Sequence, residues 1–240
     1  MYNLETTLDG TKIANNGETI LRVNVPHLDI SELKDSFYFV PNDNYFTAGS
    51  RYRTTSRIRI TECGYELLPR VPLYQPSYVN KLGSYGGIDR DYADVPKSLL
   101  KTRSFDIMIK EWLASIPYVV ESFSIHQIRT TDNGNPTPEG AHRDGTDWTG
   151  VYIVNRHNIA DTSGATRYWD VKGDLVLDHV FPEGVLINHY DRYFTHCATP
   201  IVKVDPDEPS YRDVFVITSP EHGVNRQQET YRREVLTAEA

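Results

Sequence analysis

The sequence predicts a mainly β fold, a sandwich or jelly-roll barrel with a flanking helix, and three observations support this. Residues 118–219 contain eight short apolar or alternating segments separated by turn residues. Sixteen tyrosines and eight phenylalanines, against two methionines, favour pleated surfaces over a helix bundle. Fourteen prolines and fifteen glycines supply frequent turns. The chain has the length of one domain, and we expect residues 1–240 to form it.

The first half is expected to be mixed. Residues 49–60 predict a strand in which four arginines share one face, because all four positions are odd. This face is either a solvated surface or a basic wall that meets a substrate carboxylate. Residues 74–90 are rich in glycine and tyrosine, which is typical of a long loop that either covers a site or lies on the surface. The four arginines are Arg51, Arg53, Arg57 and Arg59.

The clearest helix is expected from about Pro96 to Ser115, since proline suits a first turn and Pro117 ends the pattern. Its apolar residues approximate the spacing of a buried stripe, so it should pack on the outside of a sheet. The strands that follow are expected at 118–130, 141–144, 148–155, 165–170, 174–180, 184–189, 193–203 and 211–219.

Composition excludes several classes of protein. The net charge of -8 argues against a nucleic-acid surface, which would be basic. No apolar stretch approaches the length of a membrane span, and the first residues lack the pattern of a secretory signal. Cys63 and Cys197 are too few for a disulfide scaffold, so we expect two reduced thiols in a cytoplasmic protein.

Three residues predict a metal site. His142 and Asp144 are two positions apart, so on an extended strand both side chains point to the same face. His196 follows after room for several strands. Two imidazoles and one carboxylate are the ligand set of non-haem iron(II) oxygenases, which leaves coordination positions free for chemistry. A single His-x-Asp occurs by chance in many chains, whereas the ordered set is harder to dismiss.

Other polar side chains could bind a keto-acid. Arg212 opens the apolar run Val-Phe-Val-Ile, and a guanidinium there could bind a carboxylate bidentately. In 118–130 the odd-numbered face changes from apolar to polar, as a barrel interior does near its mouth, which makes Gln127 and Arg129 candidates. An exposed strand end is the alternative for these two residues. Asn155 could likewise reach a bound acid.

The chain resembles the 2-oxoglutarate/Fe(II) dioxygenase family that includes free L-isoleucine and L-leucine hydroxylases. The resemblance covers about residues 45–219 and leaves 1–45 as a divergent N-terminal segment. It implies a double-stranded β-helix, a cupin-like jelly roll with its core at 118–219. It also implies Fe(II) held by His142, Asp144 and His196, O₂ as oxidant, and 2-oxoglutarate held by Arg212. The matching strings are Tyr52-Arg-Thr-Thr-Ser, Gly86-Gly-Ile-Asp-Arg, His126-Gln-Ile-Arg, Pro138-Glu-Gly-Ala-His-Arg-Asp-Gly, His196-Cys-Ala-Thr-Pro and Tyr211-Arg-Asp-Val-Phe-Val-Ile-Thr.

The leading functional hypothesis is hydroxylation of an unactivated C–H in a free aliphatic amino acid or a small derivative. Such a zwitterion needs a cationic handle, an anionic handle and an apolar wall. The same cofactor chemistry could instead give desaturation or cyclisation, or act on a peptidyl or carrier-bound residue. A metal-free jelly-roll binding module is the alternative from another class. The candidates are Arg57, Arg59 or Arg129 for the cation, Glu139 or Asp147 for the anion, and Trp148 for the wall.

Overall fold

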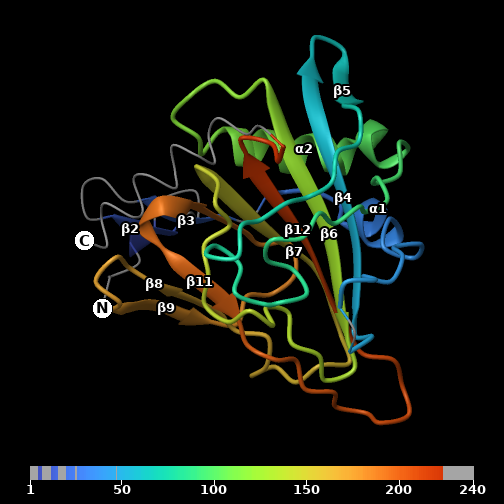
Figure 1. Cartoon of the computed structure of the whole chain (residues 1–240), viewed down its shortest axis with the longest axis vertical. Helices are drawn as coiled ribbons and strands as arrows, with labels where there is room; N and C mark the ends of the chain where they lie inside the picture. Colours follow the sequence, from blue (N-terminus) through green and yellow to red (C-terminus); the bar gives the residue numbers. More distant parts are fainter. Residues whose placement is uncertain (1–4, 7–11, 16–19, 25, 47, 224–240) are drawn as a thin grey trace.

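The computed structural model describes residues 5–6, 12–15, 20–24, 26–46 and 48–223. The strands among these residues form two antiparallel sheets. The larger has nine strands in the order β1-β2-β3-β10-β7-β12-β6-β4-β5, and the smaller has three in the order β11-β8-β9. Figure 1 shows the long central strands side by side, with α2 across them and β8, β9 and β11 grouped away from α2.

The element bounds follow the sequence pattern closely in the second half. The large sheet contains β1 (Glu5–Thr6), β2 (Lys12–Asn15), β3 (Ile20–Asn24), β4 (Arg51–Thr61), β5 (Gly64–Leu67), β6 (Ser122–Thr131), β7 (Trp148–His157), β10 (Leu186–Tyr190) and β12 (Tyr211–Ser219). The small sheet contains β8 (Thr166–Trp169), β9 (Leu175–His179) and β11 (Thr195–Ala198). The helices are α1 (Ser31–Asp35), η1 (Leu99–Lys101), α2 (Arg103–Leu113) and η2 (Asp191–Tyr193).

Thr102 divides the single helix that was expected between Pro96 and Ser115. Its backbone is extended, at φ -79° and ψ 148°, and its side-chain oxygen accepts a hydrogen bond from the Phe105 N–H. A threonine in this geometry caps the N-terminus of the helix that follows it. The 3-10 turn η1 therefore ends at Thr102 and α2 starts immediately after it.

Both faces of the large sheet are buried, and they carry two separate hydrophobic cores. One face packs against α1 and α2 through residues such as Phe105, Trp112, Phe123 and Phe215. The other packs against the small sheet; its core includes Ile128, Val151, Ile153, Val214 and, from β8, Tyr168. Two facing antiparallel sheets with helices outside form the jelly-roll architecture that the sequence predicted.

This double burial corrects one expectation about β6. Its odd-numbered residues Phe123 and Ile125 belong to the helix-side core, not to the barrel interior. The even-numbered residues His126, Ile128 and Thr130 line the interior cavity instead. The apolar-to-polar change along the odd face therefore runs under the helices.

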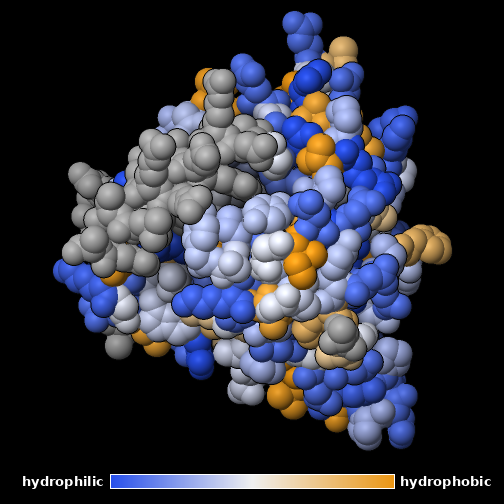
Figure 2. Space-filling model, in the orientation of Figure 1, coloured by the Kyte–Doolittle hydropathy of each residue, from blue (hydrophilic) through white to orange (hydrophobic). Residues whose placement is uncertain are grey.

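The exterior is mostly polar. Figure 2 shows hydrophilic residues over most of the visible face, with hydrophobic ones scattered among them, as is normal for a protein surface. Within the described ranges, no helix is both long and apolar enough to span a membrane.

Candidate active site

A cavity lies between the two sheets and gathers most of the chemically active side chains. It encloses about 1270 Å³ of space, including the part open to solvent. Its walls come from β4, β6, β7 and β12 of the large sheet, β8 and β11 of the small sheet, the segment between β5 and η1, and the loop that precedes β7. Six of the residues expected from the sequence line it: Glu139, His142, Asp144, Asp147, His196 and Arg212.

His142, Asp144 and His196 converge on one point of this wall. His142 Nε2 lies 3.6 Å from Asp144 Oδ1, and His196 Nε2 lies 3.7 Å from Asp144 Oδ2. The residues 141–144 do not form the expected strand. His142 and His196 make an isolated antiparallel bridge, with each backbone N–H donating to the other carbonyl at 3.0 and 2.9 Å. This bridge holds the two imidazoles with their ring centroids 4.7 Å apart.

The ring nitrogens are assigned by their neighbours. His142 Nδ1 lies 3.0 Å from the Gly140 carbonyl, so in the neutral ring it carries the proton, and loss of the Nε2 proton would free that lone pair for a metal. Gly140 and Gly145, which flank the two ligands, both have φ of +79°, a conformation that favours glycine. The short segment between them can therefore turn both side chains toward His196.

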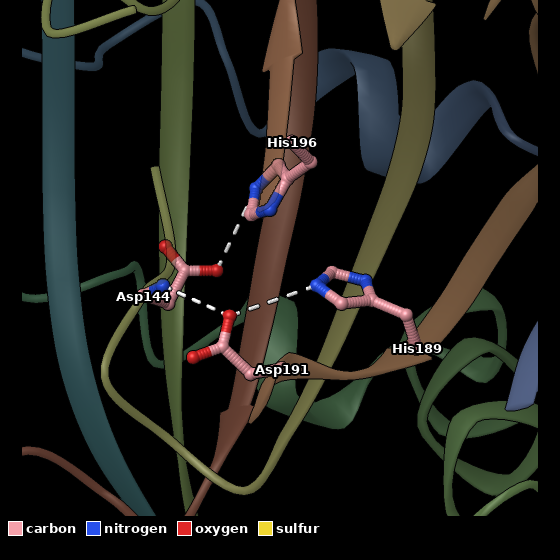
Figure 3. Close-up of side chains that lie close together, drawn as sticks. All are labelled: Asp144, His189, Asp191 and His196. Atoms are coloured by element: carbon pink, nitrogen blue, oxygen red, sulfur yellow. Dashed lines mark hydrogen bonds and ion pairs between the residues drawn. The ribbon is translucent and has the colours of Figure 1, made fainter. Parts of the chain in front are cut away.

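The Asp144 backbone is fixed from behind by Asp191. The N–H groups of Asp144 and Gly145 donate to the two Asp191 carboxylate oxygens, each at 2.9 Å, and Thr146 N–H donates at 3.3 Å. Asp191 is fully buried, and its own N–H donates to the Asp147 carbonyl at 3.0 Å. Figure 3 shows Asp191 beneath Asp144, on the side away from His196. Sequence reasoning did not single out Asp191.

His189 also lies near this centre. Together Asp144, His189, Asp191 and His196 offer ligand atoms within 4.8 Å of one another, and Figure 3 shows this group. His189 is fully buried, its Nδ1 lies 3.1 Å from the Tyr168 hydroxyl, and its Nε2 lies 3.8 Å from Asp191 Oδ1. Neither His189 nor Asp191 lines the cavity.

The charges of the three converging side chains are coupled. Burial alone would raise the pKa of Asp144, but the hydrogen bond from His142 and the charges of His196 and His142 hold it well below its usual value. Burial opposes the charged form of His142, yet Asp144 and Glu139 raise its pKa to about 9. Burial lowers the pKa of His196 well below its usual value. The site therefore offers a carboxylate and a neutral imidazole.

Arg212 is a buried cation at the edge of the same cavity. It is 4% exposed, and its Nε has no hydrogen-bond partner among the described residues. Burial and the neighbouring charge of Arg156 lower its pKa to about 10. Thr166, on β8, also lines the cavity with a hydroxyl that has no partner in the described chain. A buried cation and hydroxyl without partners fit an anionic ligand.

Two residues expected to bind the keto-acid lie on the other face of the large sheet. Gln127 is fully buried on the helix side, where its amide oxygen accepts from Thr54 Oγ1 at 2.8 Å and its nitrogen donates to Ser36 Oγ at 2.8 Å. Asn155 follows a β-bulge on β7, which shifts the register so that it pairs with Asp213 on β12. Its side chain hydrogen-bonds to Asp213 and therefore lies on the same face of the sheet as Asp213. The prediction that both side chains point into the barrel is wrong.

Four of the substrate-binding candidates also lie outside the cavity lining. Arg129 donates to both carboxylate oxygens of Asp213, at 2.7 and 2.8 Å. Arg57 contacts Glu221 at 3.4 Å, and Arg59 is exposed. Trp148 is 1% exposed in the helix-side core, where its indole N–H donates to Ser115 Oγ at 3.1 Å.

The basic wall exists on β4, but at different positions from those chosen. Arg51 and Arg53 are buried and line the cavity, together with His126 from β6 and Gln75 from the segment between β5 and η1. The shared odd face of the arginines was the signal. It could not separate the buried end of the strand from its exposed end.

Comparisons with known proteins agree with this geometry. A family model described as 2OG-Fe dioxygenase matches residues 34–218. The comparison with curated proteins finds no match. Solved structures that share 14–22% of their residues with this chain show that it has the same fold.

Three solved structures are similar. A BsmA homologue from Methylobium petroleophilum PM1 has a TM-score of 0.66 at 22% identity, over 82% of this chain and 85% of that chain. IDO from Bacillus thuringiensis has a TM-score of 0.64 at 14% identity, over 82% and 92%. The Fe(II)/α-ketoglutarate-dependent dioxygenase TqaL has a TM-score of 0.57 at 15% identity, over 81% and 75%.

Proposed function

This chain belongs to the 2-oxoglutarate/Fe(II)-dependent dioxygenase family, and we propose that it hydroxylates an unactivated C–H of a free aliphatic amino acid or a small derivative. Its cofactors are Fe(II), 2-oxoglutarate and O₂, and membership of the family sets aside the metal-free binding module. The observation that carries the proposal is Arg212, a buried cation that makes no ion pair with a described residue and opens onto the same cavity as His142, Asp144 and His196.

We assign iron to His142, Asp144 and His196. All three line the cavity, so a metal there is open to a co-substrate. His189 and Asp191 are less suited, because Asp191 already accepts three backbone N–H bonds and neither side chain reaches the cavity. Bound iron supplies the oxidative chemistry that couples decarboxylation of 2-oxoglutarate with insertion of one oxygen atom into a C–H bond.

The protein residues then bind and orient. Arg212 provides donors for the distal carboxylate of 2-oxoglutarate, and the Thr166 hydroxyl provides a further one. Arg156 Nη2 donates to the Ala160 and Ser163 carbonyls, and its guanidinium adds positive charge next to Arg212. The apolar side chains Val214 and Val216 line the cavity wall on the same strand and exclude water from it.

The amino-acid substrate rests on the mixed charge of the cavity. Arg53 on one wall and Glu139 and Asp147 on another give both signs that a zwitterion requires. Apolar side chains such as Leu73 and Val151 lie between them along the lining, and could contact an aliphatic substrate side chain.

The first experiment is anaerobic addition of Fe(II) and 2-oxoglutarate, with the visible metal-to-ligand charge-transfer band as readout. We expect the band in the wild type, its loss in His142→Ala, and its retention in His189→Gln. Arg212→Met should weaken 2-oxoglutarate binding on the order of 10- to 100-fold, since bonds to charged groups contribute about 1.5–3 kcal/mol each. No band in the wild type contradicts the proposal, and a band lost only in His189→Gln contradicts the iron assignment.

The substrate class is tested by succinate release with each of the twenty amino acids. We expect stimulation above the background by one or more aliphatic amino acids, with a product heavier by one oxygen atom. Uniform background turnover would contradict the free amino acid and favour a peptidyl or carrier-bound residue. A product lighter by two hydrogens would indicate desaturation or cyclisation.

A further inference from the structure

A cluster of buried charges stands behind one wall of the cavity. Arg51 and Arg53 on β4 lie near the carboxylate of Asp43, and Arg90, in the segment between β5 and η1, adds a third buried cation close to Arg53. All four are nearly inaccessible, at 5%, 8%, 2% and 0% exposure. Asp43 accepts a hydrogen bond from the Tyr85 hydroxyl at 2.6 Å and lies 3.7 Å from Arg51 Nε. Two guanidinium groups therefore share one buried carboxylate, and a third cation lies beside them.

The excess positive charge is turned toward the cavity. Arg90 is not among the lining residues; its Nη2 donates to Gln75 Oε1 at 2.7 Å and its guanidinium lies 4.6 Å from the centre of the Tyr85 ring. Arg51 donates through Nη1 to the Pro136 carbonyl at 2.8 Å. Arg53 is the remaining cation on the lining. Buried cations that outnumber their counter-charges are costly, so a ligand of negative charge is favoured beside Arg53.

Arg53 is held in place by neutral groups. Its Nη2 lies 3.1 Å from His126 Nδ1, its Nε donates to Thr55 Oγ1 at 3.4 Å, and its guanidinium lies 5.0 Å from the Tyr92 ring centre. Burial, and then the charge of Arg53, hold the pKa of His126 well below its usual value. The neutral imidazole therefore accepts at Nδ1. Nη1 of Arg53 has no hydrogen-bond partner among the described residues.

This group is distinct from the 2-oxoglutarate residues. In the sheet register Arg53 lies opposite Ile128 on β6, and Ile128 lies opposite Val214 on β12. These two apolar side chains also line the cavity, so they separate Arg53 from Arg212 along the wall. The cavity consequently has two cationic ends, and one keto-acid engages only one of them through its distal carboxylate.

We propose that Arg53, oriented by His126 and Tyr92, binds the free carboxylate of the primary substrate. The inference rests on the proposed function and deepens it, because a free carboxylate is absent from a peptidyl or carrier-bound residue. Glu139 is the matching anion: it lines the cavity, and its Oε1 lies 3.7 Å from His142 Nε2. Its carboxylate is placed to receive the ammonium group of an α-amino acid.

The test measures binding, not turnover. Protein loaded with Mn(II) and 2-oxoglutarate is titrated calorimetrically with each of the twenty free L-amino acids, and then with the C-terminal amides of those that bind. The variants are Arg53→Gln, Arg53→Lys and, as matched control, Arg59→Gln on the exposed end of the same strand. Affinity for 2-oxoglutarate is measured for every variant.

The wild type should bind a free acid on the order of 10- to 100-fold more tightly than its amide, the range expected for a hydrogen-bonded charge. Arg53→Gln should lower acid binding to the level of the amide and leave amide binding unchanged. Arg53→Lys should retain part of the preference, and Arg59→Gln all of it. Affinity for 2-oxoglutarate should stay within about 2-fold of the wild type throughout.

Several results would overturn the inference. These are equal binding of acid and amide by the wild type, a preference that survives in Arg53→Gln, and binding of none of the twenty amino acids. Loss of 2-oxoglutarate binding in both Arg53 variants but not in Arg59→Gln would make Arg53 a co-substrate residue. If Arg53→Gln does not fold, Arg53→Lys decides, and full acid preference there overturns the inference. Failure of the wild type to bind 2-oxoglutarate is the separate failure of the proposed function.

Discussion

The carboxylate of Asp191 should control the metal site without touching the metal. Its two oxygens accept three backbone N–H bonds from Asp144, Gly145 and Thr146, and the side chain is fully buried. The change Asp191→Asn keeps the size of the side chain and replaces one acceptor oxygen by a donor NH₂. The amide cannot accept all three bonds in either orientation.

The loss of folding free energy in Asp191→Asn depends on which carboxylate oxygen the NH₂ group replaces. Oδ2 accepts two of the N–H groups and Oδ1 accepts the Asp144 N–H. The better orientation places the amide oxygen at the Oδ2 position, which leaves the Asp144 N–H facing the NH₂ group. One unsatisfied buried donor costs about 1–3 kcal/mol. The two remaining bonds lose their charge, about 1 kcal/mol more. The free energy of unfolding should fall by about 2–4 kcal/mol in total.

Metal affinity should fall together with stability, because the N–H that loses its acceptor belongs to Asp144, a proposed metal ligand. Loss of groups that orient ligands lowers metal affinity about 10- to 100-fold. The assays are calorimetric titration with Mn(II) and thermal unfolding, where a loss of this size lowers Tm by roughly 4–16 °C. Asp174→Asn, at an exposed turn, is the control. Wild-type metal affinity in a folded Asp191→Asn protein would refute the reasoning.

Three further changes probe other parts of the molecule. Arg129→Met removes the cation that donates twice to buried Asp213, so the free energy of unfolding should fall by about 3–5 kcal/mol in denaturant titration. The affinity for 2-oxoglutarate should stay unchanged. A large loss of that affinity would show that Arg129 belongs to the site. Burial lowers the pKa of His222 to about 4, so its contribution to stability is full above pH 6.5 and is lost as the pH falls toward 4. At pH 5.5 the loss is about 1.4 kcal/mol, and it should be absent from His222→Gln in the same unfolding series. Gly150→Ala brings a Cβ to 2.5 Å from Trp112 Cδ1, so the free energy of unfolding should fall by about 1–3 kcal/mol. An unchanged Tm would show that α2, which carries Trp112, can shift to make room.

The gathering of His142, Asp144, His196 and Arg212 in one cavity could be predicted because the signals of these residues are local. His142 and Asp144 are neighbours in sequence, and Arg212 is a charge at the start of an apolar strand. Asp191 and His189 carry no such signal. Asp191 acts through hydrogen bonds to backbone groups of a distant loop, and a backbone N–H leaves no trace in the residue pattern. The partners of buried polar groups generally depend on the fold, so they emerge only from the structure.

The errors on β6 and β7 have one physical origin. Strand alternation tells which residues share a face, but it does not tell which of two buried faces contains the site. On β6 the more polar even face, with His126 and Thr130, lines the cavity, while the apolar odd face meets the helices. On β7 the register shifts between Asp213 and Val214, so Asn155 moves to the face opposite Ile153. A bulge reverses the parity of every residue beyond it.

The same reasoning explains why Arg53, and not Arg57 or Arg59, is the cation beside the cavity. The four arginines of β4 share parity, but the strand extends beyond the cavity at one end. Arg57 meets the acid Glu221 there, and Arg59 reaches solvent. Arg53 lies where the strand is covered on both faces, so water cannot screen its charge, and it shares the loop carboxylate Asp43 with Arg51. Burial combined with unequal charge, rather than the number of arginines on the face, marks the position where an anionic ligand is favoured.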